Sequence, residues 1–140
     1  MFNVDGFARG KPGPAGIGGV LRDSRGKVLC VFSLFVSVRD SNEARLMAIG
    51  KATDLCSANP LMHGREIVFV SDSKVAVSWI NGVGFGNLKY VDLVYDIRNC
   101  LVSLGGAVLS FRSRSSNSYA DNLAKLGSSM GGDFINWDVG

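Results

Sequence analysis

Two apolar stretches separated by a short polar turn follow the first residues of the chain. Residues 17–21 and 28–36 are apolar, and the turn between them, Asp23 to Gly26, begins with an acid and ends with glycine. This order is typical of a β-turn, so the pattern predicts a long hairpin over residues 16–36. Because the short segment 2–5, with Phe2 and Val4 alternating with polar residues, precedes it, we expect three consecutive antiparallel strands.

Three later segments repeat apolar residues at helical spacing. The first follows Ser41, a suitable N-cap, and favours a helix buried over a broad face. The second, from Tyr90 to Leu104, is the clearest amphipathic helix and stops at two glycines. The third spans residues 118–126, and residues 115–117 offer caps for it. The apolar positions are Ala44, Leu46, Ala48, Ile49, Ala52, Leu55 and Cys56; Tyr90, Leu93, Val94, Ile97, Cys100, Leu101 and Leu104; and Ala120, Leu123 and Ala124.

An uninterrupted apolar run, residues 67–70, is typical of a strand that is covered on both faces. A short helix is expected over 74–80, then a glycine-rich connector over 83–87, and a last strand over 107–112. The order of strands and helices predicts an α/β fold, a mixed sheet with helices on its faces.

The length of 140 residues suits one domain, which we place at residues 1–127, with a C-terminal tail at 128–140. Phe134 and Trp137 in the tail are expected to pack back onto the body. Apolar residues make up 46% and charged residues 19%, which excludes a disordered or fibrous chain. No apolar run is long enough to span a membrane, and Asp5 interrupts the N-terminal one, so we expect an intracellular protein without a signal peptide.

The net charge and the cysteine content exclude few kinds of partner or site. The net charge of +3 permits a polyanionic partner without requiring one. Cys30, Cys56 and Cys100 are odd in number and far apart, so they indicate buried free thiols rather than a disulfide framework or a zinc site. The glycine-rich stretch after Arg9 first suggests a phosphate-binding loop, but neither a P-loop nor a GxGxxG motif is present.

Four acids lie at the ends of predicted elements. Asp5 closes the first strand, Glu43 opens the first long helix, Asp72 closes the buried strand and Asp121 lies in the first turn of the last helix. Each alone has an ordinary explanation, as a helix N-terminal charge, a cap or a turn residue. If the two strands are neighbours, however, the carboxylates meet at one edge of the sheet and repel unless a cation joins them. Carboxylate oxygens select Mg²⁺ or Mn²⁺, and two such ions suit phosphodiester cleavage.

Four motifs surround these acids. They are Phe2-Asn3-Val4-Asp5-Gly6 with Gly10-Lys11-Pro12-Gly13-Pro14-Ala15-Gly16; Ser41-Asn42-Glu43-Ala44; Val70-Ser71-Asp72-Ser73; and Arg114-Ser115-Ser116-Asn117-Ser118-Tyr119-Ala120-Asp121-Asn122-Leu123-Ala124. In this order they resemble the type 1 ribonuclease H family, and most closely the plant ribonuclease H-like domains related to retroelements. The likeness covers residues 2–126. It implies a ribonuclease H-like fold, in which helices flank a five-stranded mixed sheet of three antiparallel strands and two parallel additions.

The resemblance also implies an activity, the endonucleolytic cleavage of the RNA strand of RNA/DNA hybrids to leave 5′-phosphate and 3′-hydroxyl ends. On motif match, Asp5, Glu43, Asp72 and Asp121 take the places of the family's catalytic, metal-binding carboxylates. Two Mg²⁺ or Mn²⁺ ions are then expected per site with substrate. The expected partner is a nucleic acid, the RNA/DNA hybrid, and not a membrane. We expect a monomer or one domain of a larger polyprotein.

Substrate contacts are expected from backbone amides and from basic and amide side chains. Some bacterial relatives bind hybrid through a basic protrusion after the second helix, but here the connector 83–87 has no base. Each remaining cation, taken alone, has the simpler interpretation of a solvated surface residue. The glycines and prolines of 10–16 are interpreted as a tight connection that lets the backbone approach a ribose hydroxyl, which distinguishes RNA from DNA. The candidate substrate-binding residues are Gly6, Lys11, Asn42, Lys74, Arg114 and Asn117, with Arg9 and Arg112 as further cations.

Two positions depart from the family pattern. Active members often carry a histidine ten residues before the last acid, where this chain has Phe111, and Ser113 stands where related sequences often have proline. His63 lies in the loop before the buried strand, where a surface role is expected. Two hypotheses follow: a ribonuclease H of reduced activity, or a nucleic-acid-binding module that kept the fold and lost turnover.

Overall fold

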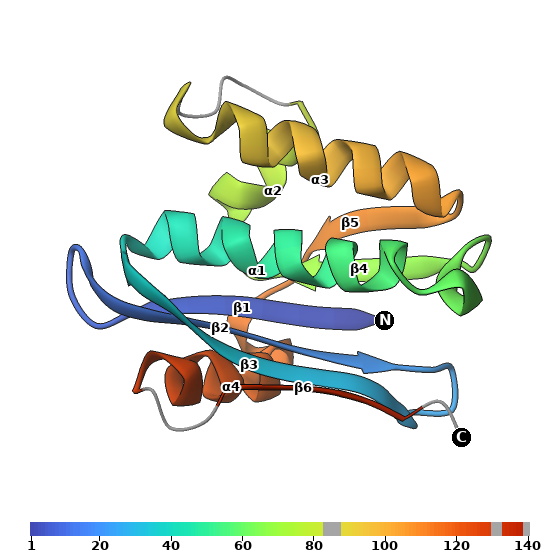
Figure 1. Cartoon of the computed structure of the whole chain (residues 1–140), viewed down its shortest axis with the longest axis horizontal. Helices are drawn as coiled ribbons and strands as arrows, with labels where there is room; N and C mark the ends of the chain where they lie inside the picture. Colours follow the sequence, from blue (N-terminus) through green and yellow to red (C-terminus); the bar gives the residue numbers. More distant parts are fainter. Residues whose placement is uncertain (83–87, 130–132, 139–140) are drawn as a thin grey trace.

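The computed structural model describes residues 1–82, 88–129 and 133–138 (Figure 1). The expected glycine-rich connector over 83–87 lies outside the described residues. In chain order the elements are β1 (Phe2–Ala8), β2 (Gly13–Arg22), β3 (Val28–Arg39), α1 (Ser41–Ser57), η1 (Pro60–Met62), β4 (Ile67–Ser71), α2 (Lys74–Ile80), η2 (Leu88–Tyr90), α3 (Val91–Leu104), β5 (Ala107–Phe111), η3 (Arg114–Ser116), α4 (Ser118–Ser128) and β6 (Phe134–Trp137).

The sheet is mixed, and its strand order is β5-β4-β1-β2-β3-β6. Strands β1, β2 and β3 pair in antiparallel order, whereas β4 and β5 run parallel to β1, so the predicted five-stranded arrangement is confirmed. A sixth strand, β6, pairs with the outer edge of β3, where Cys30 faces Trp137. The sequence did not predict β6, because its four residues are too few for a clear alternation and its pairing depends on the free edge of β3. Trp137 packs against the core, as expected.

Helices α1, α2 and α3 cover one face of the sheet, and α4 lies on the other (Figure 1). β1 therefore contacts α1 on one side and α4 on the other. Between the sheet and α1, the fully buried rings of Phe2, Phe32 and Phe69 pack with centroids 5.9 and 5.8 Å from that of Phe2. Burial of such rings contributes about 2 kcal/mol each, so β1, β3 and β4 are held firmly together. This core fixes β1, which carries Asp5, and β4, which leads into Asp72.

The helix caps differ from those expected in two places. Asp40, not Ser41, caps α1, because its Oδ1 accepts a 2.7 Å hydrogen bond from the backbone N–H of Glu43. Ser73 rather than Asp72 caps α2, through a 3.1 Å bond from the N–H of Ala76 to its Oγ. The carboxylate of Asp72 is therefore not used by the helix that follows it.

Two glycines allow the sheet and the helices to approach each other through their backbones. A Cβ at Gly6 in β1 would lie 2.2 Å from the carbonyl carbon of Ala44 in α1. A Cβ at Gly16 in β2 would lie 2.2 Å from the carbonyl oxygen of Ala124 in α4. Gly13 and Gly16 thus belong to β2, and Gly16 packs against α4. The sequence had instead suggested that the glycines and prolines of 10–16 form a tight connection.

The remaining expectations concern surface and thiol residues. His63 is exposed, and its Nε2 lies 2.7 Å from the carbonyl oxygen of Ser57, at the opposite end of β4 from Asp72. The three cysteines are free, with Cys30 and Cys56 buried and Cys100 partly buried. None of the helices in the described ranges has both the length and the apolar character needed to cross a bilayer.

Candidate active site

Two neighbouring parallel strands bring Asp5 and Asp72 close together. Asp5 does not close β1, contrary to what the sequence had suggested, because the pairing of β1 with β2 continues to Ala8, whereas Asp72 directly follows the last residue of β4. Asn3 of β1 pairs with Val70 of β4, and each acid follows two residues further along its strand direction. Asp121 approaches them from the first turn of α4, which packs against β1. Asp72 and Asp121 both lie close enough to Asp5 to raise the pKa of its carboxyl group.

Asp5 is buried, with 3% of its surface exposed, and its Oδ1 accepts a 2.8 Å hydrogen bond from the N–H of Gly6. Its pKa is raised from the ordinary 3.8 to about 8, mainly by burial and next by the negative charge of Asp72. The Gly6 hydrogen bond opposes this shift, while hydrogen bonding and charge from Asp121 add to it. An acid with such a pKa lacks a cation that would stabilise its charged form.

Asp72 has the least satisfied side chain of the cluster. The side chain is 3% exposed, and neither carboxylate oxygen has a hydrogen-bond partner among residues 1–82, 88–129 and 133–138. Asp72 forms an ion pair with Arg114, whose Nε lies 3.6 Å from Oδ2, too far for a hydrogen bond. A buried carboxylate without partners is costly, so this position favours an additional positive charge.

Glu43 and Asp121 each face a basic side chain of the protein. Arg39 Nη1 lies 3.3 Å from Glu43 Oε2, and Lys125 Nζ lies 3.0 Å from Asp121 Oδ2. Sequence reasoning missed both bases. Lys125 follows Asp121 by four residues on α4, the spacing that signals such pairs on a helix, whereas Arg39 ends β3 and meets Glu43 at the start of α1. The backbone contact of Gly6 with Ala44 places Glu43 near Asp5, the residue before Gly6.

We tested whether these residues suit the divalent ions that the resemblance implies. Among the described residues, no three acidic, histidine or cysteine side chains already enclose a position for a metal. The donors are nevertheless hard carboxylate oxygens, and the partnerless Asp72 and the raised pKa of Asp5 both indicate a need for positive charge. The residues therefore fit a divalent cation, provided that Glu43 and Asp121 turn away from their basic partners to share it.

Phe111 lies directly beside the acids. It ends β5 and pairs in register with Ser71, the residue before Asp72. The ring is partly exposed, and Lys74 Nζ lies 5.3 Å from its centroid, within cation–π range. Position 111 therefore lies on the neighbouring strand opposite the residue before Asp72, and its ring contacts the candidate substrate-binding residue Lys74.

The candidate residues Lys11 and Asn42 lie at a second part of the same end of the molecule. Both are exposed and line a hollow of about 620 Å³ formed by the β1–β2 connection, the end of β3 and the start of α1. Arg39 and Glu43 line it too, so the hollow adjoins the acid at the start of α1.

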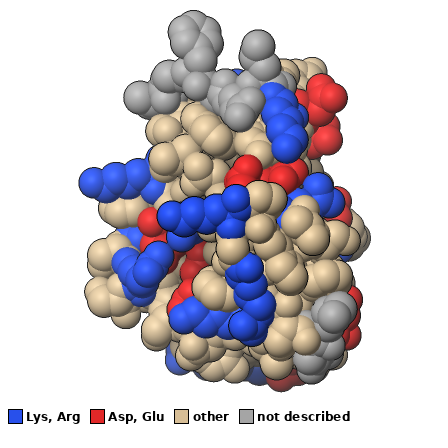
Figure 2. Space-filling view, turned by 90° about the vertical axis from the view of Figure 1, so that its left-hand side faces the viewer, with Lys and Arg blue, Asp and Glu red and all other residues tan. Residues whose placement is uncertain are grey.

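A third group of cations lies where β1 meets α4. Arg9 and Lys125 lie 5.9 and 5.6 Å from the ring centroid of Phe7, and Arg9 also donates a 3.0 Å hydrogen bond to Ser128. Figure 2 shows the end of the molecule where the β1–β2 connection and the start of α1 lie, with Lys and Arg side chains gathered around acidic ones. This arrangement suits a polyanion that approaches the acids.

Asn117 and Gly6 lie where β1 contacts α4 and α1, respectively. Asn117 is buried, donates a 2.8 Å hydrogen bond to the carbonyl oxygen of Val4 and accepts one from Asn3. Its side chain thereby ties the start of α4 to β1. Gly6 has the backbone of α1 against it, as described above. Arg112 and Arg114 are exposed, and Arg114 extends toward Asp72.

The pKa of Asp5 gives a prediction for the metal-free protein. Between pH of about 4 and 8 the folded protein holds a proton that the unfolded chain has lost, so its stability falls as pH rises through this window. The slope is at most about 1.4 kcal/mol per pH unit for one proton. Asp5→Asn cannot ionise but can still accept from Gly6, so its stability advantage over the wild type grows from pH 4 to pH 8.

Urea unfolding in EDTA at several pH values measures this difference between the two proteins. Asn replaces a carboxylate of similar shape, so the wild type itself is the matched reference. A constant gap between the two stability curves would contradict the assignment of the raised pKa to Asp5.

A known protein family and solved structures resemble this chain in sequence and in fold. A family model described as reverse transcriptase-like matches residues 3–127. LC11-RNase H1, isolated from compost by a metagenomic approach, is similar over 93% of this chain and 95% of its own, with 27% identity and a TM-score of 0.84. The same protein in complex with an RNA/DNA hybrid gives 26% identity, coverage of 93% and 96%, and a TM-score of 0.84.

A more distant solved structure shares the fold. RNase H1 from the halophilic archaeon Halobacterium salinarum is 22% identical, covers 92% of this chain and 96% of its own, and has a TM-score of 0.82. A search of curated protein sequences found no significant match.

Proposed function

Because the chain belongs to the reverse transcriptase-like family and has a ribonuclease H fold, we propose that it is a metal-dependent endonuclease that hydrolyses the RNA strand of RNA/DNA hybrids. The observation that carries the proposal is the convergence of Asp5, Asp72 and Asp121, with the buried carboxylate of Asp72 left without hydrogen-bond partners in the part of the chain that the structure describes. The relative solved with a bound RNA/DNA hybrid supports the choice of substrate.

The residues that would hold two Mg²⁺ or Mn²⁺ ions are Asp5, Glu43, Asp72 and Asp121. When bound, such ions activate water and stabilise the leaving oxygen of a phosphodiester. Asp5 and Asp72 give up little solvent contact on binding, because both are already buried by the fold. Arg39 and Lys125 hold Glu43 and Asp121 until the substrate complex forms.

The surrounding cations orient the substrate. Lys11 and Asn42 bind one strand at the hollow beside Glu43, and the Arg9–Lys125 pair on Phe7 binds phosphates on the α4 side. Arg114, next to Asp72, binds phosphate near the bond to be cut. These contacts replace the basic protrusion of bacterial relatives, whose position in this chain lies outside the described residues.

The proposal is tested with an RNA strand labelled at one end and offered in three forms, paired with DNA, paired with RNA, or single-stranded. We expect internal cuts in the RNA of the hybrid alone, with 3′-hydroxyl ends, in the presence of Mg²⁺ or Mn²⁺. Cutting of single-stranded RNA at the same rate would show a different ribonuclease activity.

A second candidate function, a binding module that has lost turnover, is favoured by one observation. Phe111 stands beside Ser71 and Asp72, where active family members often have histidine, and its ring cannot carry a proton. Such a module would bind the hybrid through the same cations without cutting it.

Phe111→His separates the two candidates. Because general acid or base catalysis contributes about 10²- to 10⁴-fold and the new side chain is not optimised, we expect the initial rate of hybrid cleavage to rise about tenfold or more. Phe111→Leu, which removes the ring and adds no base, is the matched control and should show no gain. If neither variant cuts although both bind the hybrid, the binding module is the better description.

A further inference from the structure

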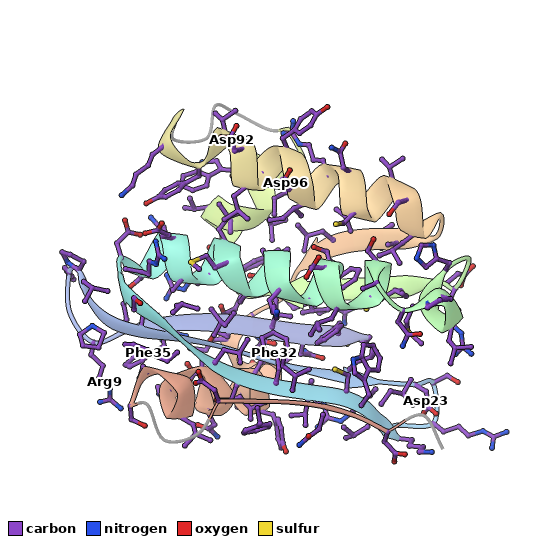
Figure 3. All side chains as sticks on the ribbon, in the orientation of Figure 1. Arg9, Asp23, Phe32, Phe35, Asp92 and Asp96 are labelled. Atoms are coloured by element: carbon purple, nitrogen blue, oxygen red, sulfur yellow. The ribbon has the colours of Figure 1, made fainter. Side chains whose placement is uncertain are left out.

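A hollow of about 460 Å³ lies along the outer side of α1, between α3 and β3, and none of the four acids of the candidate active site lines it. In Figure 3, Asp96 lies on α3 above α1, and Phe35 lies on β3 below it. The hollow is thus a groove whose floor is helix α1 and whose two walls are α3 and β3.

The floor and walls of this groove are apolar. Leu34, Val36, Met47 and Leu93 line it, and all four pack against the core while keeping part of their surface exposed. Gly50 allows α3 to lie close, since a Cβ there would be 3.2 Å from the tip of Leu93. A concave surface with several partly exposed apolar side chains is typical of an interaction site.

The rim of the groove is acidic. Asp54, Asp96 and Asp133 are exposed and line it, against a single lysine, Lys51. Within the described part of the chain, neither Asp54 nor Asp96 takes part in an ion pair, whereas Asp133 accepts a 2.8 Å hydrogen bond from the N–H of Phe35. Three carboxylates around one ammonium give this groove a negative rim on a chain whose net charge is +3.

We propose that this groove docks a basic amphipathic helix of a partner protein. From Met47 to Asp54 the floor follows eight residues of α1, a rise of about 10 Å or two helical turns. A partner helix with apolar residues at i, i+3, i+4 and i+7 matches this length, and flanking Lys or Arg residues reach the carboxylates of the rim. A nucleic acid is disfavoured, because its phosphates would meet Asp54 and Asp96.

The probe is a synthetic peptide of about 18 residues, long enough to be helical, with Leu on one face and Lys on the other. One control peptide carries Glu in place of Lys, and another has the same composition with the Leu residues moved out of helical spacing. In ¹⁵N NMR titrations we expect the basic helix to shift amides of residues 34–36, 47–54 and 93–100, and to bind at least about tenfold more tightly than either control.

A charge reversal tests the rim directly. Asp54→Lys combined with Asp96→Lys should weaken binding of the basic peptide at least about tenfold and should let the acidic peptide bind. Asp92→Lys is the matched control, because Asp92 lies on α3 one turn before Asp96 and does not line the groove (Figure 3). The proposal is overturned if the shuffled peptide binds as well as the helical one, or if the double variant binds the basic peptide like the wild type. It is also overturned if the shifts lie at the acidic cluster, or if they appear with protein concentration alone, which would indicate self-association.

Discussion

Asp72→Asn is expected to lower the rate of hybrid cleavage by at least about 1,000-fold. The reason is that Asp72 is the buried acid without hydrogen-bond partners, and it stands beside Asp5 at the strand edge. Loss of a metal-binding carboxylate removes several kcal/mol of transition-state stabilisation, and about 4 kcal/mol corresponds to 1,000-fold. The same change removes a negative charge that raises the pKa of Asp5, so the metal-free variant should melt no lower than the wild type.

This prediction is checked by measuring initial rates of hybrid cleavage and thermal melts for the wild type and for Asp72→Asn. Asp92→Asn carries the same substitution at an exposed position of α3 and should keep wild-type activity. A variant that melts normally and still cuts within tenfold of the wild type would remove Asp72 from the active site.

Gly6→Ala is expected to destabilise the protein by about 3 kcal/mol, toward the upper end for overpacking. The added methyl group would lie 2.2 Å from the carbonyl carbon of Ala44 and 2.4 Å from the backbone nitrogen of Arg45, so the start of α1 must move. For a chain of this size the melting temperature falls by on the order of 10 °C. Hybrid cleavage should fall too, because Glu43 precedes the displaced Ala44.

Gly50→Ala provides the comparison within the same helix. Its new methyl group meets only the ends of flexible side chains, Leu93 at 3.2 Å and Ile97 at 3.6 Å. Alanine also favours a helix over glycine by roughly 0.5–1 kcal/mol, so its melting temperature should stay the same or rise. Equal effects of the two substitutions would contradict the close contact between β1 and α1.

The layers of the fold could be predicted from the sequence because the apolar patterns are long. The helical repeat of residues 91–104 predicts a helix, and the structure has α3 there. The apolar run before Asp72 predicts a buried strand, and the structure has β4 there. β6 could not be predicted, since its four residues form a strand only through the edge of β3. Asp40 displaced Ser41 as the cap of α1 because its carboxylate reaches the N–H of Glu43.

The grouping of the acids could be predicted in part. Asp5 lies within β1 and Asp72 directly follows β4, so their meeting depends on the parallel pairing of these two strands, which the sequence left as a condition. The pairing of Glu43 with Arg39 depends on side-chain geometry, and so does the burial that leaves Asp72 without hydrogen-bond partners in the ranges that the structure describes. The periodicity of apolar residues contains no information on either. The acidic rim of the groove over α1 was also hidden, because Asp54, Asp96 and Asp133 come from three distant segments.

The central claim is that Asp5 in β1, Asp72 after β4 and the acids beside them form the active site of a metal-dependent nuclease for RNA in hybrids. One Mg²⁺ titration of hybrid cleavage, run side by side on the wild type and Asp72→Asn, tests it most directly. We predict no cutting by either protein in EDTA, and cutting that rises with Mg²⁺ in the wild type alone. Equal cutting by both proteins, which signals a contaminating nuclease, or a wild type that binds the hybrid and never cuts it at any Mg²⁺ concentration, would contradict the claim.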